Sequence, residues 1–193
     1  MVSFNKATLF CFVAAACTNA ATVNYNWNIA AHNIAPDGFT RSAALINGVY
    51  PGPLLKAFKG DSVNINVNNQ LNDPTMRKST SIHWHGIFQP RNAYNDGPSF
   101  VTQCPIAPNH TYDYRLVLGQ QAGTFWYHSH LSTQYVDGIR GPLVIYDPLD
   151  PHRLSYDVDN DNTVITLTDW YHTPALISTN AWFAGGAEPI PDS

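Results

Sequence analysis

Two stretches of the chain alternate apolar residues with asparagine, and no other feature limits the possible folds as strongly. Residues 23–29 place Val, Tyr, Trp and Ile at every second position, and residues 63–68 place Val, Ile and Val in the same way. Side chains alternate between the two faces of a β-strand, so each stretch predicts a strand with one buried face. Asparagine is a poor strand former, and the regular apolar period must therefore outweigh local propensity.

Several other short stretches predict strands, and turn residues separate them. Clusters of glycine, proline, asparagine and aspartate mark the turns, in a chain with 14 prolines and 12 glycines. No segment has a convincing amphipathic helical pattern. We expect an all-β antiparallel sandwich or Greek-key barrel from about residue 22 to residue 147. The further strand candidates are Ala43–Ile46, Thr80–His85, Tyr112–Leu118, Gly123–His128 and Leu143–Tyr146.

The first 20 residues read as a separate unit. Lys6 precedes a short apolar run over residues 7–16, and small residues follow, as in a secretory signal peptide. That run is too short to span a membrane, and no later segment is apolar enough to do so. We therefore expect residues 1–20 to be a signal peptide and the mature protein to be soluble, secreted and extracellular. The net charge of −4 and the lack of a basic run argue against nucleic acid or a membrane surface as a partner.

The chain changes character after residue 150. Residues 148–161 are rich in proline and aspartate, as in a linker. Val164–Trp170 predicts one more strand, and the remainder to Ser193 resembles a loop. We expect a first domain over residues 21–150. Residues 151–193 would be a linker followed by the start of an incomplete second domain, or a tail that packs on the first.

Two short histidine motifs carry the chemistry: His83-Trp84-His85 and His128-Ser129-His130. Each lies in or at the end of a predicted strand, so its two imidazoles point the same way and its middle residue points the other way. Four imidazoles converging from two strands would bind a borderline ion such as copper or zinc. The remaining histidines stand alone and are not expected to bind metal: His32, His110, His152 and His172.

Cys104 is the only cysteine that would remain after the signal peptide is removed. A single cysteine in a secreted chain indicates a free thiol, an intermolecular bridge, or a disulfide partner outside this chain. Asn109 heads the only Asn-x-Ser/Thr sequon, which predicts an exposed loop that can carry a glycan.

Longer stretches around the histidines resemble a known family. Ser81–Gly86, Asn95–Ile106, Gly123–Pro148 and Asp169–His172 are similar to the N-terminal part of fungal laccases, which are multicopper oxidases. The resemblance runs from about Ile34 to Ser193. It implies a cupredoxin-like (plastocyanin-like) Greek-key domain, followed by the opening segment of a second, incomplete cupredoxin-like domain.

The resemblance also implies a metal site and a reaction. His83 would bind the type 2 copper, and His85, His128 and His130 would bind the type 3 pair, in a trinuclear cluster between the first and third domains. That cluster reduces dioxygen to water with electrons that a type 1 copper takes one at a time from phenolic small molecules. Asp96 would be the carboxylate that assists proton delivery near the type 2 copper, although Asn-Asp-Gly-Pro is also an ordinary turn. Family members pair the equivalent of Cys104 with a cysteine near their C-terminus.

The type 1 copper ligands and the other half of the cluster do not occur in this sequence. A laccase needs further histidines and a His-Cys-His arrangement, supplied by its C-terminal domains. We therefore expect this chain to be a fragment or truncated form of a secreted laccase, inactive on its own. Two alternatives stay open at this point. One is another multicopper oxidase, such as a ferroxidase or ascorbate oxidase, and the other is a short copper- or zinc-binding protein without turnover. Lignin breakdown, pigment formation and detoxification are all roles of the family.

Overall fold

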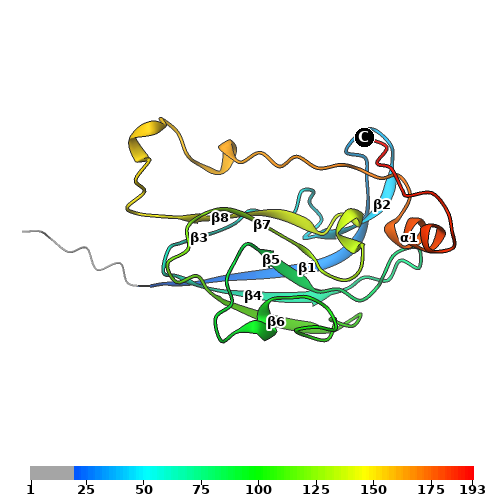
Figure 1. Ribbon diagram of the computed structural model, residues 1–193, viewed down its shortest axis with the longest axis horizontal. Coiled ribbons are helices and arrows are strands. Elements are labelled where there is room, and N and C mark those ends of the chain that lie inside the picture. The colour runs from blue at the N-terminus through cyan, green and yellow to red at the C-terminus, as the bar shows by residue number, and fades with distance from the viewer. Residues whose placement is uncertain (1–19) are drawn as a thin grey trace, which may run out of the picture.

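Eight strands form two sheets that stack face to face in the computed structural model, which describes residues 20–193 (Figure 1). The first sheet has the order β2-β1-β4-β6, and the second has the order β3-β8-β7-β5. The first contains β1 (Thr22–Ile34), β2 (Arg41–Ile46), β4 (Ser62–Asn69) and β6 (Thr111–Val117). The second contains β3 (Leu55–Phe58), β5 (Ile82–His85), β7 (Gly123–Ser129) and β8 (Arg140–Tyr146). Short helices follow in the loops and the tail: η1 (Ala93–Asn95), η2 (Gln134–Asp137), η3 (Arg153–Ser155), η4 (Asp161–Thr163) and α1 (Ala175–Phe183).

The core lies between the two sheets and is rich in aromatic rings. Trp27 of the first sheet packs its ring 4.5 Å from that of Tyr127 and 5.7 Å from that of Trp84, which both belong to the second sheet. All three side chains are at most 2% exposed. The apolar positions of both alternating stretches face this core, as their period predicted.

The asparagines of the two alternating stretches lie on the outer face, where four of the six bond to one another. β1 and β4 run side by side in register, and the Asn64 amide donates to Asn24 while the Asn68 amide donates to Asn28, each at 3.1 Å. These two amide pairs offset the low strand propensity of asparagine at the four positions, because each of the four side chains has a cross-strand partner.

The prediction of an all-β sandwich is confirmed, but its purely antiparallel character is wrong. β1 pairs with β4 in parallel, and β3 pairs with β8 in parallel. β1 is long enough to serve two neighbours, since its first part pairs with β4 and its second part with β2. Alternation along one strand reveals which face is buried but carries no information about the direction of the neighbouring strand.

Two predictions for the tail are also wrong. Val164–Trp170 is extended but forms no strand, and Ile165 and Leu167 are 82% and 90% exposed. The residues after Trp170 were expected to be a loop, yet they include helix α1. Its apolar residues point in several directions and only Ala175 and Thr179 are buried, so it lacks the stripe that sequence periodicity detects.

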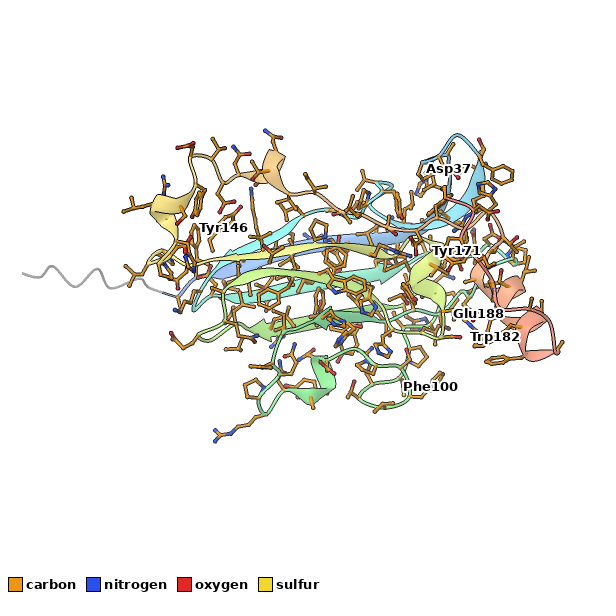
Figure 2. The ribbon with its side chains drawn as sticks, turned by 45° about the horizontal axis from the view of Figure 1, so that its top comes forward. Asp37, Phe100, Tyr146, Tyr171, Trp182 and Glu188 are labelled. Carbon is orange, nitrogen blue, oxygen red and sulfur yellow. The ribbon has the colours of Figure 1, made fainter. Side chains whose placement is uncertain are left out.

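The tail packs on the first domain through a buried group of residues. Trp170 contacts Ala43 and Leu45, and the Arg41 guanidinium lies 4.2 Å from the centre of its ring. Arg41 pairs with Asp137 of η2 at 3.3 Å, and both side chains are at most 4% exposed. Figure 2 shows Asp37 at the same end of the molecule, where its carboxylate accepts a hydrogen bond from the Ser193 hydroxyl. These contacts attach the tail to the first domain.

The arrangement of the strands does not test the predicted signal peptide or the predicted second domain. The predicted signal peptide lies outside the described residues, apart from Ala20. The assignment of residues 151–193 to a second domain stays a prediction. Among residues 20–193, no helix is both long enough and apolar enough to cross a membrane.

Candidate metal centre

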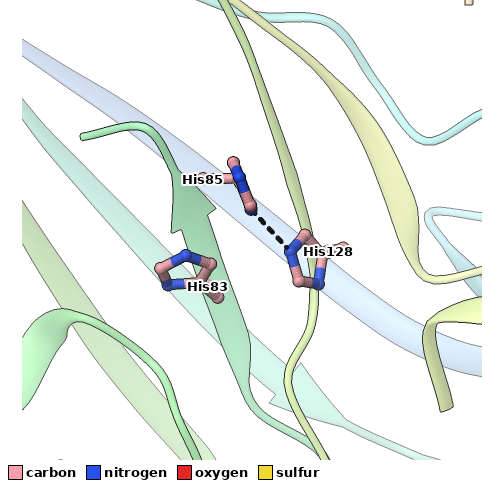
Figure 3. A group of neighbouring side chains, drawn as sticks. All are labelled: His83, His85 and His128. Atoms are coloured by element: carbon pink, nitrogen blue, oxygen red, sulfur yellow. Dashed lines mark hydrogen bonds between the residues drawn. The ribbon is translucent and has the colours of Figure 1, made fainter. Parts of the chain in front are cut away.

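The pairing of β5 with β7 brings the two histidine motifs together. The strands are antiparallel, and their register sets His83 opposite His128. The His83 ring centre lies 5.3 Å from those of His128 and His130 and 5.5 Å from that of His85 (Figure 3). All four imidazoles therefore meet at one sheet end, as the alternation of side chains predicted.

Three of these histidines already have the spacing of a metal-binding group. One ring nitrogen each from His83, His85 and His128 lies within 4.8 Å of the other two. His130 stands outside this tight group, with its ring centre 5.9 Å from that of His128.

Main-chain carbonyls fix the orientation of two of the rings. Nδ1 of His83 lies 2.7 Å from the Asp96 carbonyl oxygen, and Nδ1 of His128 lies 2.9 Å from the Ser129 carbonyl oxygen. A carbonyl only accepts, so Nδ1 carries the proton in each ring and Nε2 keeps its lone pair. That lone pair is the metal-binding one, and a histidine ligand is commonly held in this way by a second hydrogen bond.

Burial keeps the inner imidazoles neutral. His128 is 9% exposed, and loss of water lowers its pKa to about 4, with the neighbouring His83, His85 and His130 acting in the same direction. The pKa of His83 is lowered for the same main reason. A neutral imidazole is the form that binds a metal ion, so the site does not need to release protons from these two rings near neutral pH.

Aromatic side chains wall the site. The Trp126 ring centre lies 4.2 Å from that of His128 and 5.1 Å from that of His85, on which it stacks. The Tyr135 ring closes another side, 5.8 Å from His128. These contacts restrict rotation of the imidazoles and keep water from part of the site. The sequence analysis missed Tyr135, which lies in η2 and has no strand pattern around it.

Asp96 meets the site mainly through its backbone. Its carbonyl makes the 2.7 Å contact with His83, whereas its carboxylate oxygen lies 3.6 Å from the same nitrogen. Gly97 allows this approach, because it has a φ of +101° and a side-chain carbon there would overlap the Ile82 carbonyl oxygen. The two interpretations of Asn-Asp-Gly-Pro, an ordinary turn and a functional carboxylate, are thus compatible, since the turn itself places Asp96 against β5.

The other predicted site residues lie on the surface. Cys104 is an exposed free thiol, and Asn109 is exposed in a loop with a φ of +62°. Both positions are accessible from outside, as a disulfide partner or a glycan would require.

Comparison with known proteins connects this geometry to a family. The family model described as multicopper oxidase matches residues 28–150, which hold both strands of the histidine site. The chain belongs to the multicopper oxidases. Two solved multicopper oxidases superpose on it with a TM-score of 0.74 each. The laccase from Botrytis aclada does so at 41% identity, over 90% of this chain and 30% of that one. Fet3p, a multicopper oxidase that functions in iron import, does so at 36% identity, over 89% of this chain and 32% of that one. The predicted cupredoxin-like fold is thereby confirmed.

Fungal laccases are among the sequence relatives of this multicopper oxidase. Laccase-2 of Thanatephorus cucumeris is 56% identical over 191 residues, which is 98% of this chain and 31% of that protein. Laccase-1 of Agaricus bisporus is 52% identical over 184 residues, which is 94% of this chain and 35% of that protein. The chain thus spans about a third of the length of these laccases, and the predicted resemblance to the N-terminal part of a laccase is confirmed.

The residues of the site fit copper, the metal that the family implies. All donors in the group are imidazole nitrogens, which suit copper in both of its common oxidation states. Two of the rings have their second nitrogen already bonded, so they are oriented before any ion binds.

Proposed function

We propose that this chain is the first copper-binding domain of a laccase and supplies half of its oxygen-reducing site. The observation that carries the proposal is the convergence of His83, His85 and His128 within 4.8 Å in a chain 52–56% identical to fungal laccases. His130 completes the set of four imidazoles at the same sheet end.

The four histidines would divide between the coppers. His83 faces the other three rings and would hold the type 2 ion, while His85, His128 and His130 would hold the type 3 pair. Copper held by these four histidines would supply the redox chemistry, because it can change between two oxidation states that imidazole ligands accommodate. The protein's own part is to orient the His83 and His128 rings through the two carbonyl contacts and to shield part of the site from water with Trp126.

Asp96 would serve the proton supply. Its carboxylate lies 3.6 Å from Nδ1 of His83 and its side chain is 29% exposed, so it reaches both the site and solvent. A group placed in this way can take a proton from bulk water and pass it inward through one water molecule.

Several features of the chain would connect it to the remainder of a laccase. We propose that Cys104 pairs with a cysteine outside this chain, that Asn109 carries a glycan, and that residues 151–193 lead into a second cupredoxin-like domain. Residues 1–20 would direct secretion to the extracellular space. Phenolic small molecules and dioxygen would be the substrates of the complete enzyme, in roles such as lignin breakdown.

An iron-oxidising member of the family is the second candidate. The likeness to Fet3p has the same TM-score as the likeness to the Botrytis aclada laccase, so the fold does not separate the two. Identities of 52–56% over 94–98% of the chain favour laccase. Comparing kcat/KM for a phenol with kcat/KM for ferrous iron decides between the two candidates. The measurement needs the complete protein of which this chain would be the first domain.

Copper content of single variants tests the ligand assignment. We expect His85→Ala and His128→Ala each to lower the copper bound per chain, because each removes one imidazole from the tight group. His152→Ala, in an exposed loop of the tail, is the matched control and should bind as much copper as the wild type. Unchanged copper in both site variants, measured by elemental analysis, would refute the assignment. Retention of zinc in preference to copper would favour a metal-binding protein without turnover.

A further inference from the structure

A buried glutamine lies directly behind the histidine site. Gln134, the first residue of η2, is fully buried and makes three hydrogen bonds through its side chain. Its amide nitrogen donates to the carbonyl oxygens of Arg77 and Ser79, each at 2.9 Å. Its amide oxygen accepts from the Ser129 hydroxyl at 2.6 Å. Every polar atom of the side chain is therefore used, and the glutamine has one orientation.

Ser129 connects this glutamine to the metal site. It is the middle residue of the second histidine motif, so its side chain points into the protein while His128 and His130 point into the site. Ser129 is 1% exposed, and besides donating to Gln134 it accepts a bond from the Leu131 backbone at 3.3 Å. The hydroxyl thus fixes the chain where β7 ends and the backbone turns away from the site.

The other strand of the site begins at the segment that Gln134 holds. Residues 77–79 lead into Ser81, whose carbonyl accepts from the His130 backbone at 3.1 Å, and then into β5 with His83. Gln134 thereby connects the segment that precedes the first histidine motif to the middle residue of the second motif. A shift of either strand changes the distances among the imidazoles, because the two motifs belong to different strands.

We propose that Gln134 is a positioning residue that, together with the β5–β7 pairing, fixes the separation of the two histidine motifs for metal binding. It touches no imidazole and acts through Ser129 and through the carbonyls of Arg77 and Ser79. This inference rests on the proposed copper site. Through these contacts Gln134 would contribute to the geometry of the imidazoles, and the two histidine motifs alone do not reveal this contribution.

Asn69 offers a matched control for the experiment. It is fully buried too, donates two bonds to the carbonyls of Lys78 and Ile106, and accepts one from the Leu71 backbone. It holds the same 77–79 segment but makes no bond to Ser129. Gln134→Glu and Asn69→Asp each replace the donating nitrogen with an oxygen that faces two carbonyls, so both lose the same kind of contact.

The test is a copper titration of the 193-residue chain by chelator competition, together with the Cu(II) EPR spectrum. We expect Gln134→Glu to weaken copper binding by about 10–100-fold and to change the EPR hyperfine splitting, because supporting partners of metal ligands have effects of this size. Asn69→Asp should lower the melting temperature comparably while leaving copper affinity and EPR spectrum as in the wild type. Should Gln134→Glu fail to fold, Ser129→Ala removes the link alone and is expected to shift both readouts in the same direction.

The outcomes separate the two proposals. If the wild type binds copper and Gln134→Glu, or Ser129→Ala in its place, binds equally well with an identical spectrum, Gln134 has no positioning role. Equal weakening by Asn69→Asp overturns it as well, since general loosening would then suffice. A wild-type chain that binds no copper overturns the proposed function and this inference together.

Discussion

At the scale of single residues, the middle position of each histidine motif matters as much as its ends. Trp84 donates its ring N–H to the Asn95 carbonyl at 3.1 Å, next to the turn that brings Asp96 to His83. Ser129 plays the corresponding part for the second motif through Gln134. The alternation of a strand made the four imidazoles predictable, but the partners of these anchors lie outside the strands, in η1 and η2, where no alternating pattern reveals them.

Gly97 permits a stability prediction at this scale. Gly97→Ala should destabilise the fold by about 1–2 kcal/mol for the positive φ and by a further 1–3 kcal/mol or more for the overlap with Ile82. Gly60→Ala is the control, because Gly60 has a φ of +93° but open space around it, and it should lose only the first amount. Urea unfolding measures both. Equal losses would mean that the turn relaxes away from β5 without cost.

At the scale of elements, sequence patterns located the long strands better than the tail. The alternating apolar residues predicted β1 and β4. β3 was missed because its four residues, beside a Pro-Gly-Pro turn, are too few to reveal an alternating pattern. The apolar run over residues 164–170 predicted a strand for which the structure offers no pairing partner, and only Trp170 is buried. Strand formation depends on a neighbouring strand, which a local pattern cannot supply.

The buried pair of Arg41 and Asp137 tests how the elements are joined. Burial raises the pKa of Asp137 and lowers that of Arg41, so the lost hydration outweighs the attraction within the pair. Asp137→Asn keeps the acceptor for the Ala175 backbone but leaves the Arg41 charge buried without its partner. We expect it to destabilise the fold by about 3–5 kcal/mol.

The half-exposed pair of Lys59 and Asp147 is the control for that measurement. Its nitrogen and oxygen lie 2.9 Å apart, but the two side chains are 30% and 19% exposed. Asp147→Asn should therefore destabilise the fold much less than Asp137→Asn does, because water screens the pair. Thermal unfolding of both variants gives the comparison, and similar losses would show that burial does not distinguish the two pairs.

At the scale of the whole molecule, the histidine site is open on one side. His85 and His130 are exposed, and the loop that follows Ser99 presents Phe100 and Val101 to solvent at 79% and 83% exposure. Figure 2 shows Phe100 at the lower edge of the molecule, below the labelled tail residues Trp182 and Glu188. The Ser99 backbone donates to the His130 carbonyl at 3.3 Å, so this apolar loop borders the site directly. An apolar rim around four imidazoles is suited to contact with another protein surface.

This openness leads to a prediction about activity. Among the described residues the one cysteine is Cys104, which is exposed and belongs to neither histidine strand, so no thiolate is available to a copper beside the imidazoles. We expect the 193-residue chain to bind copper without intense blue colour and without oxidising a phenol. The longer protein, with the remaining length of a laccase, should do both. His85→Ala in that longer protein should keep the blue colour and lose dioxygen consumption, because electron entry and oxygen reduction use different ligands. Phenol oxidation by the homogeneous, copper-loaded 193-residue chain would contradict this division.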